Sequence, residues 1–182
     1  MDKNKKIGFA VIGYGGMGSW HASTCADDFK DTAELIGIYD IKPERRAAAE
    51  AEGIHAFSSR EELLADERID LVTVATPNDV HKEIAIAAMA AGKNVISEKP
   101  VALSQEELYR HYADIAAAVT LPIVMYNIPM RTGCAIEPET VSRLVVLDGV
   151  TNYPARRVKP ADVRIVEWIG DLDKLAKRKI HR

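Results

Sequence analysis

The chain has few of the residues that mark secreted, metal-rich or membrane-spanning proteins. Only two of its 182 residues are cysteines, Cys25 and Cys134, and their spacing fits no metal-binding or redox motif. No stretch approaches the ~20 apolar residues of a membrane-spanning helix, and the apolar run near the N-terminus is too short and too rich in glycine for a signal peptide. We therefore expect thiols in a reducing compartment, a cytoplasmic location and no metal site.

Aromatic residues and net charge are also low. Aromatics make up 6% of the chain, and the net charge is −3. The balance is uneven, with 15 Lys and Arg against 23 Asp and Glu in residues 1–150, but 9 against 4 in residues 151–182. A basic tail can bind nucleic acid or membranes, yet acidic residues are interleaved with the basic ones here and aromatic stacking platforms are few. We predict a small-molecule substrate and neither a nucleic-acid nor a membrane partner.

What the sequence does contain is a glycine-rich turn directly after an apolar run. The stretch IGFAVIGYGGMG near the N-terminus predicts a buried strand followed by the GxGxxG turn of a dinucleotide-binding fold. Gly13 permits the tight turn, Gly15 lets a pyrophosphate approach the backbone, and Gly18 lets the next helix pack closely on the strand. Gly16 and Met17 complete the turn, where the helix N-terminus faces the phosphates with unpaired N–H groups and a partial positive charge.

A second apolar run ends in Asp40, about 20 residues after the last glycine, as this motif requires. A carboxylate at this place accepts hydrogen bonds from the adenosine ribose hydroxyls and repels a 2′-phosphate, so the sequence favours NAD over NADP. Lys42, Arg45 and Arg46 follow closely, however, and would offer cationic partners to that phosphate. The alternative is that Asp40 is a strand-end turn residue or the N-cap of the helix that begins at Pro43.

Apolar strands and helices alternate along the chain. Strands are expected at residues 7–12, 34–40, 54–57, 69–75, 94–97 and 121–127, and helices at 19–29, 43–52, 61–65, 80–91 and 104–120. Capping boxes begin at Ser59 and Ser104, and Gly53 and Gly92 are expected to end helices. This alternation predicts an α/β fold, a doubly wound parallel sheet of the Rossmann type with right-handed crossovers. We predict the strand order 3-2-1-4-5-6, with 121–127 as the sixth strand.

Polar residues follow two of the later strands. After the strand at 69–75 come Thr76, Pro77, Asn78 and His81, and after the strand at 94–97 come Glu98 and Lys99. Because the carboxyl ends of parallel strands meet at one edge of a sheet, both groups are expected beside the glycine turn. A cation there can hold and polarise a substrate hydroxyl, which makes Lys99 the candidate catalytic residue, with a surface lysine as the alternative. For His81 the alternative is packing at the helix start, and His21 is expected to be a solvent-facing or packing residue.

These motifs together resemble the N-terminal domain of the Gfo/Idh/MocA oxidoreductases, the family of glucose-fructose oxidoreductase and inositol dehydrogenase. The resemblance covers residues 6–104 and rests on GYGGMG after the first strand, TPNDVH after the fourth and EKP, followed by VALS, after the fifth. It implies NAD as cofactor, with NADP as the alternative, and hydride transfer at a sugar- or polyol-like hydroxyl near Lys99 and the nicotinamide. The expected cofactor-binding residues are Gly13, Gly15, Gly16, Met17, Gly18, Asp40, Thr76, Pro77, Asn78, His81, Glu98 and Lys99.

Residues 104–144 resemble a different family, the dihydrodipicolinate synthase and N-acetylneuraminate lyase barrels. YNIPMRTG at residues 126–133 and EPETVSRL after it carry this resemblance. It implies that Tyr126 would assist proton transfer and that Arg131 would meet a substrate carboxylate. The Schiff-base lysine of that family stands shortly before Gly-Asp-Leu, where this chain has Val166, and without an amine no imine forms.

We therefore expect a dinucleotide-binding Rossmann domain at residues 1–130 and a short irregular C-terminal appendage at 131–182 that is not an independent domain. The function expected first is an oxidoreductase of the Gfo/Idh/MocA type, in an incomplete or fused form that lacks the usual substrate domain. The second hypothesis is a dinucleotide-binding module or scaffold without turnover, and the third is a pyruvate-dependent aldolase or lyase fragment. A homo-oligomer is compatible with this sequence.

Overall fold

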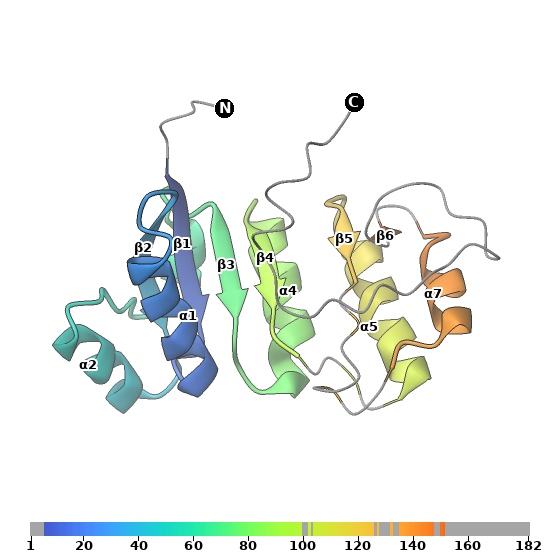
Figure 1. Cartoon of the computed structure of the whole chain (residues 1–182), viewed down its shortest axis with the longest axis horizontal. Coiled ribbons are helices and arrows are strands. Elements are labelled where there is room, and N and C mark those ends of the chain that lie inside the picture. Colours follow the sequence, from blue (N-terminus) through green and yellow to red (C-terminus); the bar gives the residue numbers. More distant parts are fainter. Residues whose placement is uncertain are drawn as a thin grey trace.

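A four-stranded parallel sheet forms the centre of the protein, and its order agrees with the first five predicted strands. The computed structural model describes residues 6–99, 102, 104–125, 127, 132, 135–147 and 150–151. The strands of the sheet are β1 (Ile7–Ile12), β2 (Ala33–Tyr39), β3 (Leu71–Val74) and β4 (Asn94–Ser97). They lie in the order β2-β1-β3-β4, all parallel (Figure 1). The predicted third strand is reduced to one parallel bridge between Ile38 and Ala56.

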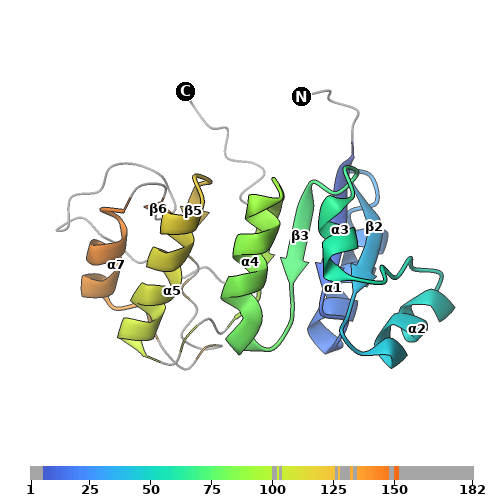
Figure 2. The ribbon, with the colours of Figure 1, turned by 180° about the vertical axis from the view of Figure 1, so that it is seen from behind.

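Helices cover both faces of this sheet, which explains why its strands are apolar on both sides. The helices that pack on this sheet are α1 (Gly16–Asp27), α2 (Pro43–Ala51), α3 (Arg60–Ala65) and α4 (His81–Ala90), which follows the 3₁₀ turn η1 (Asn78–Val80). Two later helices, α5 (Gln105–Ala118) and α7 (Pro138–Leu144), belong to a second apolar core. One apolar cluster joins Val11 to Ala22 and Ala49 of α1 and α2. Another contains Leu63 and Ala88 of α3 and α4, on the face seen in Figure 2. None of these helices is long and apolar enough to cross a membrane.

Capping interactions expected from the sequence set several helix ends. Ser59 accepts a hydrogen bond from the N–H of Glu62 at the start of α3, and Ser104 accepts one from the N–H of Glu107 at the start of α5. Both serines therefore cap their helices, which is the first of the two hydrogen bonds of a capping box. Gly92 follows α4 with a φ of +79°, a left-handed backbone conformation that favours glycine.

The predicted sixth strand does not join the main sheet, and this part of the prediction is wrong. Within the described residues, β5 (Ile123–Val124) pairs in parallel with β6 (Val150–Thr151) and not with β4. β6 also lies in the C-terminal appendage at 131–182, which is expected to be irregular. An apolar run such as 121–127 suits any parallel sheet, so the helices packed around it decide where it pairs.

A second apolar core provides the physical reason for this arrangement. α5 and α7 pack against each other and against the small β5–β6 sheet, with Leu108, Ile115, Ile123, Val141 and Val150 all buried. β5, α7 and β6 form a strand-helix-strand unit with parallel strands. β5 therefore completes this core rather than extending the main sheet.

Candidate functional site

The glycine turn links the end of β1 to α1, and its backbone admits no side chain at two positions. Gly13 has a φ of +95°, and a Cβ added there would lie 2.7 Å from the carbonyl carbon and oxygen of Ala75. A Cβ on Gly18 would collide with the carbonyl oxygen of Gly13. The helix begins at Gly16, three residues earlier than predicted, because the turn itself supplies its first residues. Gly13 and Gly18 therefore shape the turn, as the motif predicts.

Gly15 and Gly16 are different, because the packing of the protein itself does not require them to be glycine. A Cβ on Gly15 would approach only the guanidinium group of Arg45, at 3.4 Å, and a Cβ on Gly16 would meet nothing within 4 Å. Gly15 is the N-cap of α1, and no side chain caps this helix start. Unpaired N–H groups and open space at a helix N-terminus fit a pyrophosphate. Met17 lies on the outside of this first turn, 41% exposed.

Asp40 lies directly after β2, beside the glycine turn, and is 3% exposed. Its Oδ2 accepts hydrogen bonds from the Tyr14 N–H (2.7 Å) and from Arg45 Nη1 (3.1 Å), and its Oδ1 accepts one from the Lys42 N–H (2.9 Å). Burial alone would raise the pKa of Asp40, but these three hydrogen bonds outweigh it and hold the pKa below its ordinary value. Asp40 is therefore ionised and paired. It is not the N-cap of α2, because Lys42 holds that place.

The loop from Thr76 to His81 follows β3 at the same edge of the sheet. His81 is 1% exposed, and its Nε2 lies 2.6 Å from the carbonyl oxygen of Thr76, a contact that closes the loop. Pro77 and Asn78 are exposed at its tip. Within the part of the chain that the structure describes, Thr76 Oγ1 and His81 Nδ1 are buried without a hydrogen-bond partner. His81 thus holds the loop in shape, which is the packing role considered as its alternative.

Glu98 and Lys99 follow β4, and Glu98 contacts α1, the helix of the glycine turn. Glu98 Oε1 lies 2.8 Å from Nε2 of His21 on α1, and Glu98 Oε2 accepts a hydrogen bond of 3.2 Å from the Lys99 N–H. The contact with His21, followed by the Lys99 N–H, lowers the pKa of Glu98 against the effect of burial. This role of His21 differs from the solvent-facing or packing role expected from the sequence. The only available signal was its position one turn after Gly18, on the part of α1 nearest the sheet edge.

The structure thus brings the predicted site residues to one edge of the sheet. The arrowheads of β1, β3 and β4 in Figure 1 point to this edge, where the glycine turn, the loop after β3 and Lys99 follow their strands. Asp40 follows β2 and joins them through its contact with Tyr14. Tyr126, Arg131 and Val166, singled out for the lyase resemblance, lie outside the described residues.

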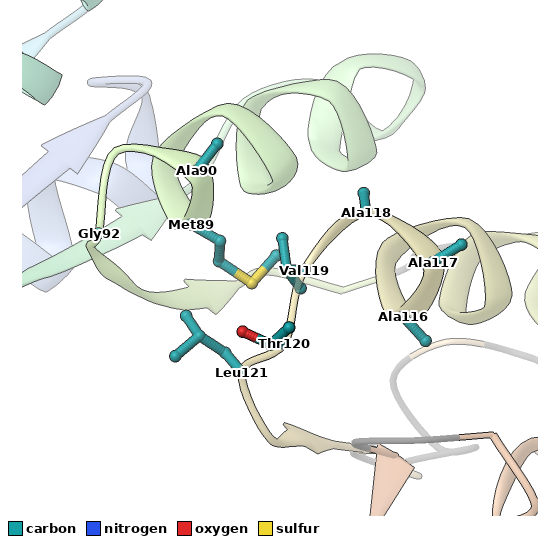
Figure 3. A pocket seen from close by; sticks show the side chains of 9 residues that line it. All are labelled: Met89, Ala90, Gly92, Ala116, Ala117, Ala118, Val119, Thr120 and Leu121. Atoms are coloured by element: carbon teal, nitrogen blue, oxygen red, sulfur yellow. The ribbon is translucent and has the colours of Figure 1, made fainter.

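A hollow of about 530 Å³ lies elsewhere, between the C-terminal ends of α4 and α5 (Figure 3). Met89, Val119 and Leu121 contribute apolar side chains to it, and Gly92, just before β4, forms part of its wall. Gly92 precedes the amino end of a strand, whereas the glycine turn and Lys99 follow carboxyl ends. The hollow is therefore not part of the candidate site.

Comparisons with known proteins agree with both of the family resemblances seen in the sequence. Glucose-6-phosphate 3-dehydrogenase of Bacillus subtilis is 40% identical over 106 residues, which are 57% of this chain and 28% of that protein. The WlbA dehydrogenase of Bordetella pertussis, solved with NADH and UDP-GlcNAcA, is 37% identical with a TM-score of 0.55 over 68% of this chain and 38% of that one. A 4-hydroxy-tetrahydrodipicolinate synthase of Acidobacterium capsulatum is 62% identical over 42 residues, 23% of this chain and 14% of that protein.

This chain thus spans less than two fifths of the length of each of these relatives. The resemblance to the oxidoreductases nevertheless extends over most of the described residues. The sequence model of the Gfo/Idh/MocA oxidoreductases, described as an oxidoreductase family with an NAD-binding Rossmann fold, matches residues 7–124. The chain therefore belongs to the Gfo/Idh/MocA oxidoreductase family, and its Rossmann fold is of the kind that takes NAD as cofactor.

Proposed function

We propose that this chain is an NAD-dependent oxidoreductase module that acts on a sugar- or polyol-like hydroxyl and is fused to a segment that resembles a second family. The observation that carries the proposal is the open space at Gly15 and Gly16. The packing of the protein does not require glycine at either position, whereas a pyrophosphate on the helix N-terminus does require a backbone without side chains.

Each residue group then has a role toward the cofactor and substrate. The N–H groups at the start of α1 would bind the pyrophosphate, and Asp40 would accept the ribose hydroxyls once Arg45 moves aside. Lys99 would donate a hydrogen bond to the substrate hydroxyl and stabilise negative charge on its oxygen. Bound NAD supplies the hydride acceptor. The loop closed by His81 would line the cofactor with Thr76, Pro77 and Asn78.

The relatives support the choice of substrate class. The Bacillus subtilis relative is named for a sugar phosphate, and the Bordetella pertussis structure contains a nucleotide sugar beside NADH. For this chain we propose a cyclic polyhydroxy compound as the substrate.

We also propose a cytoplasmic location and assembly into a homo-oligomer. The division into a Rossmann domain at residues 1–130 and an appendage at 131–182 is a further proposal, which limited proteolysis with mass spectrometry tests.

A dinucleotide-binding module without turnover is the second candidate, and one observation favours it. Hydride removal from an alcohol needs a base for the hydroxyl proton. Glu98, the carboxylate next to Lys99, already accepts hydrogen bonds through both oxygens, from His21 and from the Lys99 N–H. A lyase is the least favoured candidate, because Val166 stands where that family carries its Schiff-base lysine.

Isothermal titration with NADH and NADPH tests the proposal. Saturable binding of one dinucleotide per chain supports a redox role, and no binding of either would refute it. A screen of sugars and inositols with NAD, followed by NADH absorbance, then separates the two main candidates. Turnover that depends on Lys99 identifies an oxidoreductase, whereas binding without turnover identifies a module.

A further inference from the structure

Lys99 follows a strand that leaves its position weakly determined. β4 lies at the edge of the four-stranded sheet and, within the described residues, pairs only with β3. The last backbone contact before Lys99 is the hydrogen bond from the Glu98 N–H to the Val74 carbonyl, 2.9 Å long. Strand pairing does not fix the chain beyond that point. Other contacts must therefore hold Lys99 if its ammonium group is to meet a ligand in one geometry.

Glu98 provides such a contact, and His21 holds Glu98. The Glu98 carboxylate accepts the Lys99 N–H through Oε2 and lies 2.8 Å from His21 Nε2 through Oε1. The side chain of His21 is only 18% exposed and that of Glu98 only 16%, so water competes weakly for the contact between them. Because the pKa of Glu98 is lowered, the carboxylate is ionised at neutral pH and can only accept. His21 Nε2 therefore carries a proton and donates it.

His21 lies three residues after Gly18 on α1, the helix whose N-terminus would face the phosphates of the cofactor. The contact between His21 and Glu98 thus connects the phosphate end of the candidate site to the end that carries Lys99. We propose that His21 is a positioning residue: by holding the Glu98 carboxylate, it fixes the Lys99 backbone and with it the place of the nicotinamide. This inference rests on the proposed function, because it assigns His21 a part in the same site.

The test compares NADH with ADP-ribose, which carries the adenosine and pyrophosphate groups but no nicotinamide. Affinities are measured by titration calorimetry for the wild type and for His21→Leu, which cannot donate a hydrogen bond. We expect NADH affinity to fall about tenfold, the loss of one hydrogen bond to a charged group, and ADP-ribose affinity to stay the same. An equal loss for both ligands, or no loss for NADH, would overturn the inference. If the wild type binds neither ligand, the proposed function itself fails.

Two further variants separate positioning from a general structural role. His21→Gln places an amide N–H near the position of Nε2 and should restore most of the NADH affinity. His55→Leu makes the same change at an exposed histidine beside Phe57, away from Glu98, and should bind both ligands as the wild type does. If His21→Leu does not fold, His21→Asn replaces it, because its shorter side chain does not reach Glu98.

A second readout needs no ligand. The backbone amide signal of Lys99 in NMR spectra reports its hydrogen bond to Glu98. This signal should shift in His21→Leu and stay in place in His55→Leu. An unchanged Lys99 signal in His21→Leu would show that Glu98 keeps its position without His21 and would contradict the inference.

Discussion

The Arg45 guanidinium lies against the Asp40 carboxylate, with Nη1 3.1 Å from Oδ2. The same guanidinium group lies 3.4 Å from the place that a Cβ on Gly15 would take. Arg45 therefore stands between the carboxylate that would hold the ribose and the glycine that would admit the pyrophosphate. A dinucleotide must displace it, and a 2′-phosphate would offer it a new anionic partner.

The first prediction concerns cofactor choice. NADH should bind more tightly than NADPH, because the ionised Asp40 repels a 2′-phosphate. Asp40→Ser removes that charge and frees Arg45 and Lys42 for the phosphate, so the ratio of NADH to NADPH affinity should fall by about tenfold or more. Titration of both cofactors measures this ratio. A ratio unchanged by the substitution would show that Asp40 does not face the ribose.

The second prediction concerns alkaline pH. The Tyr14 hydroxyl donates a 2.8 Å hydrogen bond to Glu52, and burial, this bond and the charge of Glu52 raise the pKa of Tyr14 from 10.0 to about 12. Because the folded pKa exceeds the unfolded one, the resulting stability is complete below pH 10 and is lost as the pH rises toward 12. Tyr14→Phe should therefore cost about 1 kcal/mol in the free energy of unfolding at neutral pH. Urea denaturation at several pH values measures this cost, which should shrink above pH 10. A difference in unfolding free energy between wild type and Tyr14→Phe that stays constant up to pH 12 would contradict the raised pKa of Tyr14.

The third prediction concerns acid pH and the second core. His111 on α5 is buried beside Tyr112, and burial, followed by the charges of Lys82 and His81, lowers the pKa of His111 from 6.5 to about 4. The unfolded chain therefore binds the proton more readily, and stability should fall as the pH drops from 6.5 toward 4. His111→Leu should flatten this part of the pH profile of the melting temperature. His55→Leu, which removes an exposed histidine, should keep the slope of the wild type.

The fourth prediction separates binding from chemistry at Lys99. Lys99→Ala should lower NADH affinity about tenfold, as His21→Leu does, and lower any sugar or polyol oxidation at saturating NAD about a hundredfold, the usual loss for one group that stabilises developing charge. Lys82→Ala serves as the matched control, because Lys82 is a half-exposed lysine paired with Asp114 on the surface of α4 and α5. Steady-state rates of NADH formation by the wild type and the two variants test this prediction. Equal rates in Lys99→Ala and Lys82→Ala would remove Lys99 from the reaction.

The sequence predicts the main sheet because its signals are local. Apolar runs mark each strand, glycines and serine caps mark the helix ends, and right-handed crossovers then leave few possible strand orders. The pairing of Ile123 with Val150 is a different matter. This pairing depends on the packing of α5 against α7, which no local sequence pattern predicts. A run of apolar residues predicts a strand but does not indicate which sheet the strand joins.

The candidate site divides in the same way. The glycine spacing, Asp40 and the two polar loops are readable because each follows a recognisable strand. His21 is not, because a single histidine on a helix gains meaning only from Glu98, 77 positions away in the chain. The sequence indicates that Arg45 can meet a phosphate, but its contact with Asp40 depends on how α2 turns back toward the end of β2.

The most direct test of the account is a calorimetric titration of NADH into the wild type and into Gly15→Val. The Cβ of the added side chain would meet only the flexible Arg45 within 4 Å, so the variant should fold and melt close to the wild type. Gly18→Ala is the contrasting variant, because its Cβ would collide with the Gly13 carbonyl and should lower the melting temperature. We expect saturable NADH binding to the wild type and none to the folded Gly15→Val variant. Equal NADH affinity in the two proteins would contradict it.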